Sequence, residues 1–116
     1  MLLQVLFLVL DKPELLTPVL KTFLDCGVKG ATVLESTGMG RMLSREVPIF
    51  ASLRTMFENA AHHNNTIFAV IKDEAKVDRL VEALKTVLGD LEAPGTGIIF
   101  TLPVTRVIGL AGDVRA

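Results

Sequence analysis

The chain has no tryptophan, no tyrosine and a single cysteine, Cys26, among its 116 residues. One cysteine excludes an internal disulfide and a zinc ribbon, and it fits a reducing cytoplasm. Neither sign of charge dominates, because 12 basic and 13 acidic residues leave a net charge of −1. We therefore expect no nucleic-acid partner and no polybasic membrane anchor. Serine elbows, paired acid motifs, CxxC, HExxH and P-loop patterns are also missing, which favours a protein that is not an enzyme.

Apolar residues are abundant, and half of the chain is hydrophobic. This composition excludes disorder, and without any linker or repeat it predicts one domain over residues 1–116. The apolar run over residues 1–10 has no basic residues before it and no cleavage site after it. The run is too short to span a bilayer, so we interpret it as a buried strand of a protein that is not membrane-embedded.

Hydrophobic periodicity and turn residues predict two βαβ units separated by a long segment. The expected strands cover residues 2–10, 30–36, 66–71 and 98–102, with Asn64 and Asn65 as a turn and an extended piece over 105–110. One expected helix begins with Thr17 as N-cap and Pro18 at its first position, buries Val19, Leu20, Phe23 and Leu24, and ends at Gly27; the other runs from Asp73 to Gly89. This order predicts an α+β, ferredoxin-like βαββαβ sandwich, with two helices on one face of an antiparallel sheet. Because all four strands are apolar, the other face is expected to pack against other subunits.

The segment over residues 37–64 is too long for a structureless connection. Pro48 is a good first residue for a helix over 48–60, and an apolar stripe recurs there at helical spacing. The stripe contains Ile49, Leu53, Met56 and Phe57. Two interpretations are open: the stripe docks a partner, or it folds back onto its own assembly.

Two glycine-containing loops are the candidate ligand sites. We call Ser36–Arg41 (STGMGR) the first glycine loop and Pro94–Gly97 (PGTG) the second glycine loop. Exposed N–H groups in such loops can form an anion-binding nest, and Arg41 adds a guanidinium for phosphate. Ordinary turn chemistry explains each loop equally well. His62 and His63 are expected to be solvated loop residues, since no nearby ligands complete a metal site.

Several stretches together carry a resemblance to a known family. They are GVKGATV over residues 27–33, GMGR over 38–41, and GTGIIFTLPV over 95–104, with Lys12-Pro13 and the helix over 77–88 in register. In these stretches the chain resembles the PII signalling protein family over nearly its whole length.

The resemblance implies a homotrimer that binds ATP, ADP or another adenine nucleotide in clefts between subunits. It also implies a mobile T-loop, here about residues 41–64, that regulates a partner enzyme or membrane transporter, and a nucleotide-contacting B-loop at 94–98. The nucleotide-binding residues that it implies are Thr32, Gly38, Gly40, Arg41, Gly95, Thr96 and Gly97.

The chain departs from the family pattern where cations are expected. Ile98 replaces the B-loop lysine that meets phosphate oxygens, and Gly109 and Ala111 replace two arginines at the phosphates. Met42 stands where the family has a glutamine tied to 2-oxoglutarate sensing. Each lost charge-assisted contact is worth roughly 1.5–3 kcal/mol, so weak triphosphate binding is expected.

Two other functions stay open on the sequence alone. The chain could be an interaction module that has lost nucleotide binding, which the missing cations favour. It could also be a metal-tolerance protein of the related CutA type, although clustered carboxylates, histidines and cysteines are absent from the sequence pattern.

Charges placed on the apolar stripe distinguish its two interpretations. If the stripe packs against the assembly, Leu53→Asp with Phe57→Asp should lower the free energy of unfolding by several kcal/mol, because two carboxylates would be buried. If the stripe docks a partner, the melting temperature should stay unchanged while partner capture is lost. Thr55→Asp with Asn59→Asp, which lies off the stripe, is the control, and fast hydrogen exchange throughout 48–60 would contradict the helix itself.

Overall fold

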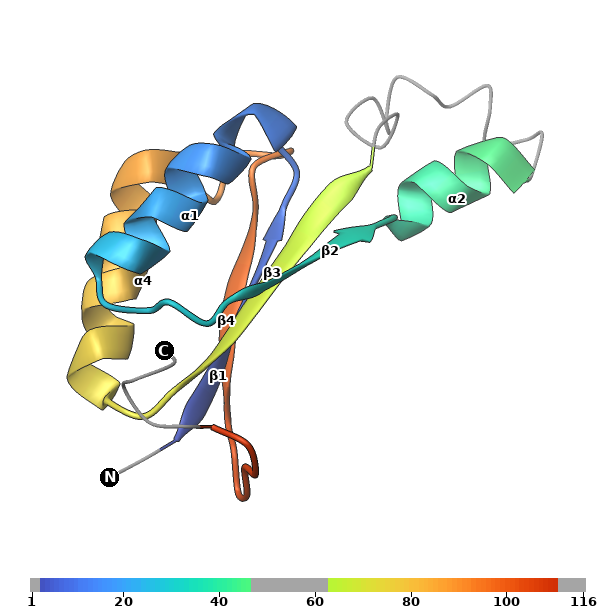
Figure 1. Ribbon diagram of the computed structural model, residues 1–116. Coiled ribbons are helices and arrows are strands. Elements are labelled where there is room, and N and C mark those ends of the chain that lie inside the picture. Colours follow the sequence, from blue (N-terminus) through green and yellow to red (C-terminus); the bar gives the residue numbers. More distant parts are fainter. Residues whose placement is uncertain (1–2, 47–62, 111–116) are drawn as a thin grey trace.

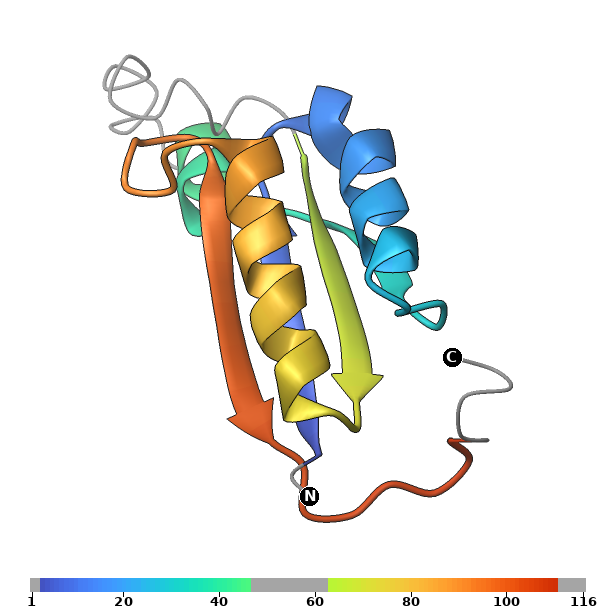
Figure 2. The ribbon, with the colours of Figure 1, turned by 90° about the vertical axis from the view of Figure 1, so that its left-hand side faces the viewer.

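A four-stranded antiparallel sheet with the strand order β2-β3-β1-β4 forms the centre of the structure (Figure 1). The structure is a computed structural model and describes residues 3–46 and 63–110. Along the chain the elements are β1 (Gln4–Leu10), the 3-10 helix η1 (Pro13–Leu15), α1 (Leu16–Asp25), β2 (Thr32–Ser36), α2 (Met39–Glu46), β3 (Asn64–Ile71), α4 (Glu74–Leu88) and β4 (Gly97–Pro103). The helices α1 and α4 lie side by side on one face of the sheet (Figure 2). The predicted ferredoxin-like α+β fold is confirmed, with α2 as an addition between β2 and β3.

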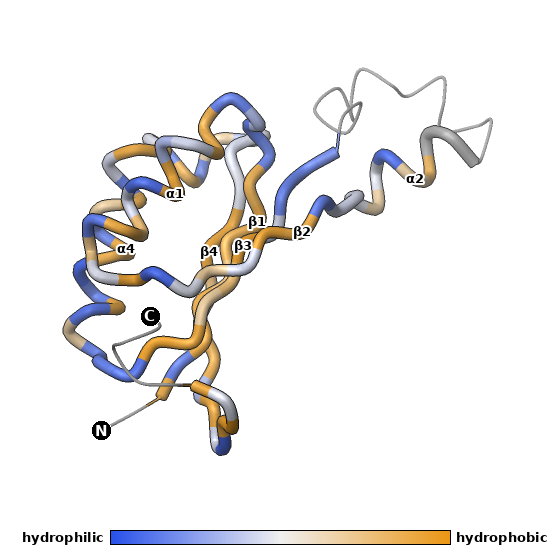
Figure 3. Tube along the Cα trace, in the orientation of Figure 1, coloured by the Kyte–Doolittle hydropathy of each residue, from blue (hydrophilic) through white to orange (hydrophobic). Residues whose placement is uncertain are grey.

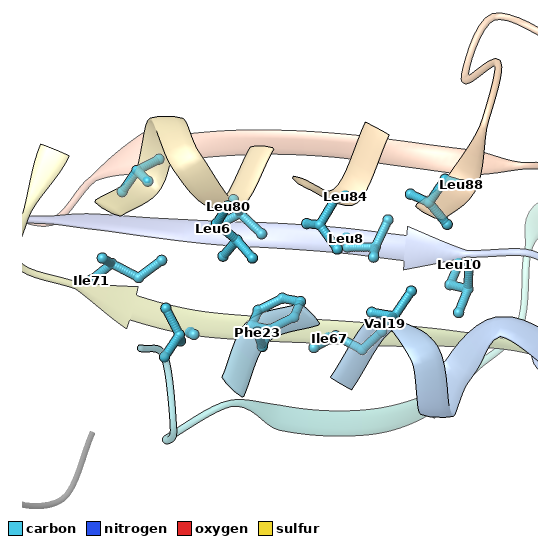
Figure 4. Packing of buried hydrophobic residues seen from close by; sticks show 13 residues of the cluster. Leu6, Leu8, Leu10, Val19, Phe23, Ile67, Ile71, Leu80, Leu84 and Leu88 are labelled. Atoms are coloured by element: carbon cyan, nitrogen blue, oxygen red, sulfur yellow. The ribbon is translucent and has the colours of Figure 1, made fainter. Parts of the chain in front are cut away.

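Alternating side chains of the inner strands build the core beneath α1 and α4. In β1, Leu6, Leu8 and Leu10 are fully buried while the residues between them are only half-buried. The same alternation in β3 buries Ile67, Ala69 and Ile71. The helices close the core from above with Val19, Phe23, Val77, Leu80, Leu84 and Leu88 (Figure 4).

The opposite face of the sheet is apolar, and in the part of the chain that the structure describes no helix covers it, although α2 projects away from the end of β2 on this side (Figure 1). Phe7 of β1 lies between Phe68 of β3 and Phe100 of β4, with ring centroids 5.5 Å and 5.0 Å apart. We call this surface the open face; Figure 3 shows the apolar colour of its strands, and its apolar members are Val5, Phe7, Val9, Leu34, Phe68, Val70, Ile98, Phe100 and Leu102. The expectation that one face lacks a helical layer is confirmed.

The ends of the second long helix agree with the prediction. Asp73 is the N-cap of α4, where its Oδ1 accepts a hydrogen bond from the N–H of Ala75 at 2.9 Å. Gly89 ends the helix with a φ of +79°. Gly27 follows α1 in the same way, with a φ of +82°, because a left-handed residue after a helix is best supplied by glycine.

The start of α1 differs from the prediction. Thr17 is not an N-cap and Pro18 is not the first helical residue, because α1 already begins at Leu16 and continues from η1. Pro18 is still tolerated in the first turn, where a backbone N–H has no intrahelical acceptor. Leu24, expected in the core, is 56% exposed, because the helix turns it away from the sheet that Val19 and Phe23 contact.

Two further expectations were wrong, and one lies outside the description. Asn64 and Asn65 do not form a turn but begin β3, since both pair with neighbouring strands. Residues 105–110 bend at Thr105, Ile108 and Gly109 and so do not form one extended piece. The helix expected over 48–60, with Ile49, Leu53, Met56 and Phe57, lies outside the described residues. Among the residues that are described, no helix is long and apolar enough to cross a membrane.

Candidate functional site

Both glycine loops leave the same end of the sheet, but at its opposite edges. Glu35, Asn65, Leu10 and Gly97 are neighbours in one row across β2, β3, β1 and β4. Three strand spacings of about 4.8 Å separate the two edges, so the loops start about 14 Å apart within one protomer. One subunit therefore places the loops level with each other without joining them into a single pocket.

The second half of the first glycine loop is helical. Gly40 and Arg41 lie in α2, which begins at Met39, and the N–H of Met42 donates to the carbonyl of Gly38 at 3.2 Å. Neither Gly38 nor Gly40 has a positive φ, so the expected loop-type anion nest is not formed. The sequence indicated a loop because two glycines disfavour a helix. The first N–H groups of α2, which have no acceptor within the helix, take the place of the nest, and Arg41 is half-buried in the same turn.

The second glycine loop is held tightly against β1. Gly95 and Gly97 have φ values of +81° and +145°. A Cβ on Gly97 would collide with the carbonyl oxygen of Val9, so only glycine fits at this position. Thr96 is 2% exposed, and its Oγ1 donates to the carbonyl of Asp90 at 3.3 Å. The Thr96 side chain therefore supports the loop, and its carbonyl accepts a hydrogen bond from the N–H of Asp11 at 3.1 Å.

Thr32 lies apart from the two glycine loops, and Ile98 lies next to the second one. Thr32 is at the far end of β2, exposed and opposite Phe68, about 13 Å along the strand from Ser36. Ile98, which the resemblance aligns with a lysine, is 56% exposed on the open face. A groove of about 520 Å³ runs from Gly97 and Ile98 along β4 to Val81 and Lys85 of α4.

Sequence reasoning missed a set of polar residues at the root of both loops. Asn64 donates from Nδ2 to Asp11 Oδ1 at 3.1 Å and accepts from the Ser36 hydroxyl. Thr37 Oγ1 lies 3.0 Å from Nδ1 of the exposed His63. Asn64 and Asp11 are 53 positions apart, so only the strand register could have indicated their contact. Within residues 3–46 and 63–110, no three His, Cys, Asp or Glu side chains gather where they could hold a metal ion.

Comparisons with known proteins agree with this geometry. The profile of the family described as "Nitrogen regulatory protein P-II" matches residues 7–113. Among solved structures 127 chains match, including the crystal structure of Arabidopsis thaliana PII bound to citrate. That chain is 20% identical, with a TM-score of 0.66 over 97% of this chain and 86% of the plant chain. No curated protein matches the chain.

Replacing Gly97 by alanine should measure how closely the second glycine loop approaches β1. Both Gly97 and Gly89 have positive φ values, but a Cβ on Gly89 would meet nothing within 4 Å. We expect Gly97→Ala to lower the free energy of unfolding by roughly 3 kcal/mol or more, and Gly89→Ala by about 1–2 kcal/mol. Urea unfolding followed by circular dichroism gives both values, and equal losses would contradict the close approach.

Proposed function

The chain belongs to the nitrogen regulatory protein P-II family, and from this we propose that it is a trimeric, non-enzymatic regulator. In this proposal the trimer binds a small ligand between subunits and controls a partner enzyme or membrane transporter through residues 41–64. The observation that carries it is the placement of the two glycine loops at one end but at opposite edges of the sheet. A ligand site that uses both loops needs the first loop of one subunit beside the second loop of another. We place the protein in the cytoplasm, which its single cysteine supports.

The open face supports a homotrimer. Ile98, Phe100 and Leu102 are 56%, 41% and 49% exposed in the single chain, next to the half-buried Phe7 and Phe68. Full burial of each such side chain contributes roughly 1.5–3 kcal/mol. A continuous apolar surface of this kind is rare on a monomer and typical of an interface between subunits. Three copies that turn these faces inward would give the sheet the second layer that it lacks.

The ligand chemistry follows from the charges near the loops. Arg41 and the backbone N–H groups at the start of α2 favour an anion, and the Gly95–Gly97 backbone can approach a ligand closely. Ile98 offers no charge where the family has a cation, so we expect an anion of low charge to bind better than a triphosphate. Citrate, which the Arabidopsis PII protein binds, is one ligand to test beside adenine nucleotides.

An interaction module without a ligand is the second candidate function. The identity of residue 98 favours it, because Ile98 offers a phosphate no charge-assisted hydrogen bond where the family has a lysine. The two functions share the trimer and differ only in ligand binding.

A charge on the open face should break the assembly. Phe100→Asp would place a carboxylate next to Phe7 in the interface, where it would be desolvated without a partner. Multi-angle light scattering should give three times the 12.6 kDa chain mass for the unsubstituted protein and a smaller mass for the variant. Leu24→Asp, an equal change on an exposed site of the helical layer, is the control. A 12.6 kDa particle for the unsubstituted protein at micromolar concentration would contradict the trimer.

Ligand binding should depend on Arg41. Thermal shift against ATP, ADP, AMP and citrate identifies the ligand, and calorimetry then compares Arg41→Ala with the unsubstituted protein. We expect the affinity to fall tenfold or more, about 1.4 kcal/mol, whereas Arg79→Ala on the exposed side of α4 should leave it unchanged. If none of these ligands shifts the melting temperature, the interaction module is the better description.

A further inference from the structure

Four residues at the loop end of the sheet form one continuous row of hydrogen bonds across all four strands. The pairing of Leu10 with Asn65 and with Gly97 puts Asp11 opposite both Asn64 and Thr96 in the next row, and Ser36 pairs with Asn64. We propose that the Asn64–Asp11 pair couples the first glycine loop to the second, so that a change at one loop is transmitted to the other. This coupling would operate in ligand regulation only if the proposed function holds, but the coupling itself does not depend on a ligand.

The first half of the row joins β2 to β1. The Ser36 hydroxyl contacts Oδ1 of Asn64 and lies 2.8 Å from Oγ1 of Thr66. From the other end of its amide, Asn64 donates through Nδ2 to Asp11 Oδ1 at 3.1 Å. A Cβ on Gly38 would lie 3.7 Å from the same Nδ2. The side chain of Asn64 is thus in contact range of the backbone that starts α2.

The second half of the row joins β1 to the second glycine loop. The N–H of Asp11 donates to the carbonyl of Thr96 at 3.1 Å, one step beyond the last pair of the β1–β4 ladder. The Thr96 hydroxyl then reaches the carbonyl of Asp90 at 3.3 Å. Asp11 therefore contacts Asn64, which lies beside the first glycine loop, through its carboxylate, and it contacts Thr96 of the second glycine loop through its backbone N–H.

The Asn64–Asp11 bond joins its two residues through side chains alone. Ser36 and Asn64 are also paired in the β2–β3 ladder, and Asp11 and Thr96 are joined by a backbone hydrogen bond. The carboxylate accepts from an amide, and a bond to a charged group is stronger than one between neutral groups. All three linking residues, Ser36, Asn64 and Asp11, are half-buried, so water competes less with their bonds than at a fully exposed site. Rotation of the Asn64 amide would move both Ser36 and Asp11. A shift at the start of α2 thereby reaches the Asp11 backbone, which fixes the Thr96 carbonyl.

Exchanging the donor and the acceptor tests the link. In Asn64→Asp two carboxylates would face each other and the donor to Asp11 would be lost. We expect the amide proton of Asp11, which bonds the Thr96 carbonyl, to exchange about tenfold faster by NMR, with shifted resonances at both glycine loops. In the double variant Asn64→Asp with Asp11→Asn, the side-chain amide now at position 11 can donate to the carboxylate now at position 64, and exchange should return to the original rate.

A distant perturbation tests the transmission itself. Ser36→Ala removes the hydroxyl on β2, and we expect faster exchange at the Asp11 amide and shifted resonances at Gly97, three strands away. Thr37→Ala, which removes only the contact with His63, should leave both signals unchanged.

Four results would overturn the proposal, the last of them a general loosening of the sheet. One is unchanged Asp11 exchange in Asn64→Asp, and another is failure of the double variant to restore it. The third is an equal effect of Asn65→Asp, which adds the same charge one residue away on the other face of the sheet. The amide of Leu8 in the middle of β1 is the internal reference. If its exchange rises by the same factor, the substitution loosens the whole sheet and the coupling is refuted.

Discussion

The burial of β1 is the constraint on which the rest of the structure depends. Its alternate leucines, Leu6, Leu8 and Leu10, have no exposed surface, and the strand pairs with β3 on one side and β4 on the other. A slip of one residue in either pairing would move these leucines out of the core, so both registers are strongly specified. The same registers bring the ends of β3, β1 and β4 to one level, and the pairing of β2 with β3 adds the fourth strand. The position of the second glycine loop is therefore a consequence of core packing, and that of the first depends on the β2–β3 pairing.

Much of this fold could be predicted from the sequence, because it follows local rules. Alternation and continuous apolar runs indicated the strands, and Asp73, Gly89 and Gly27 marked the helix ends through capping and left-handed geometry. The failures are places where tertiary contacts override local preference. Asn64 and Asn65 are typical turn residues, yet strand pairing holds them in β3, Asn65 with both neighbouring strands and Asn64 with β2. The helix α2 begins within a segment whose glycines predicted a loop.

The candidate site was predictable in its parts but not in its arrangement. The glycine loops and Arg41 could be named from the sequence, whereas the link from Asn64 to Asp11 depends on strand register, which a single sequence does not show. The structure also shows that a residue of a ligand-binding motif can be required by the fold itself. Gly97 is required by its approach to Val9, and Thr96 by its bond to Asp90, so both would be needed without any ligand.

The open face also bears on how the chain folds during synthesis. A newly made protomer exposes Ile98, Phe100 and Leu102 beside the unpaired outer edge of β4, and the outer edge of β2 is unpaired within the described chain as well. Such surfaces bind other chains without selectivity, so for the proposed trimer aggregation competes with correct association until the face is covered. Association of subunits depends on concentration, and a complex that forms only from folded chains stabilises them by mass action. Dilution would then favour unfolding, and the thermal stability of the protein would rise with its concentration.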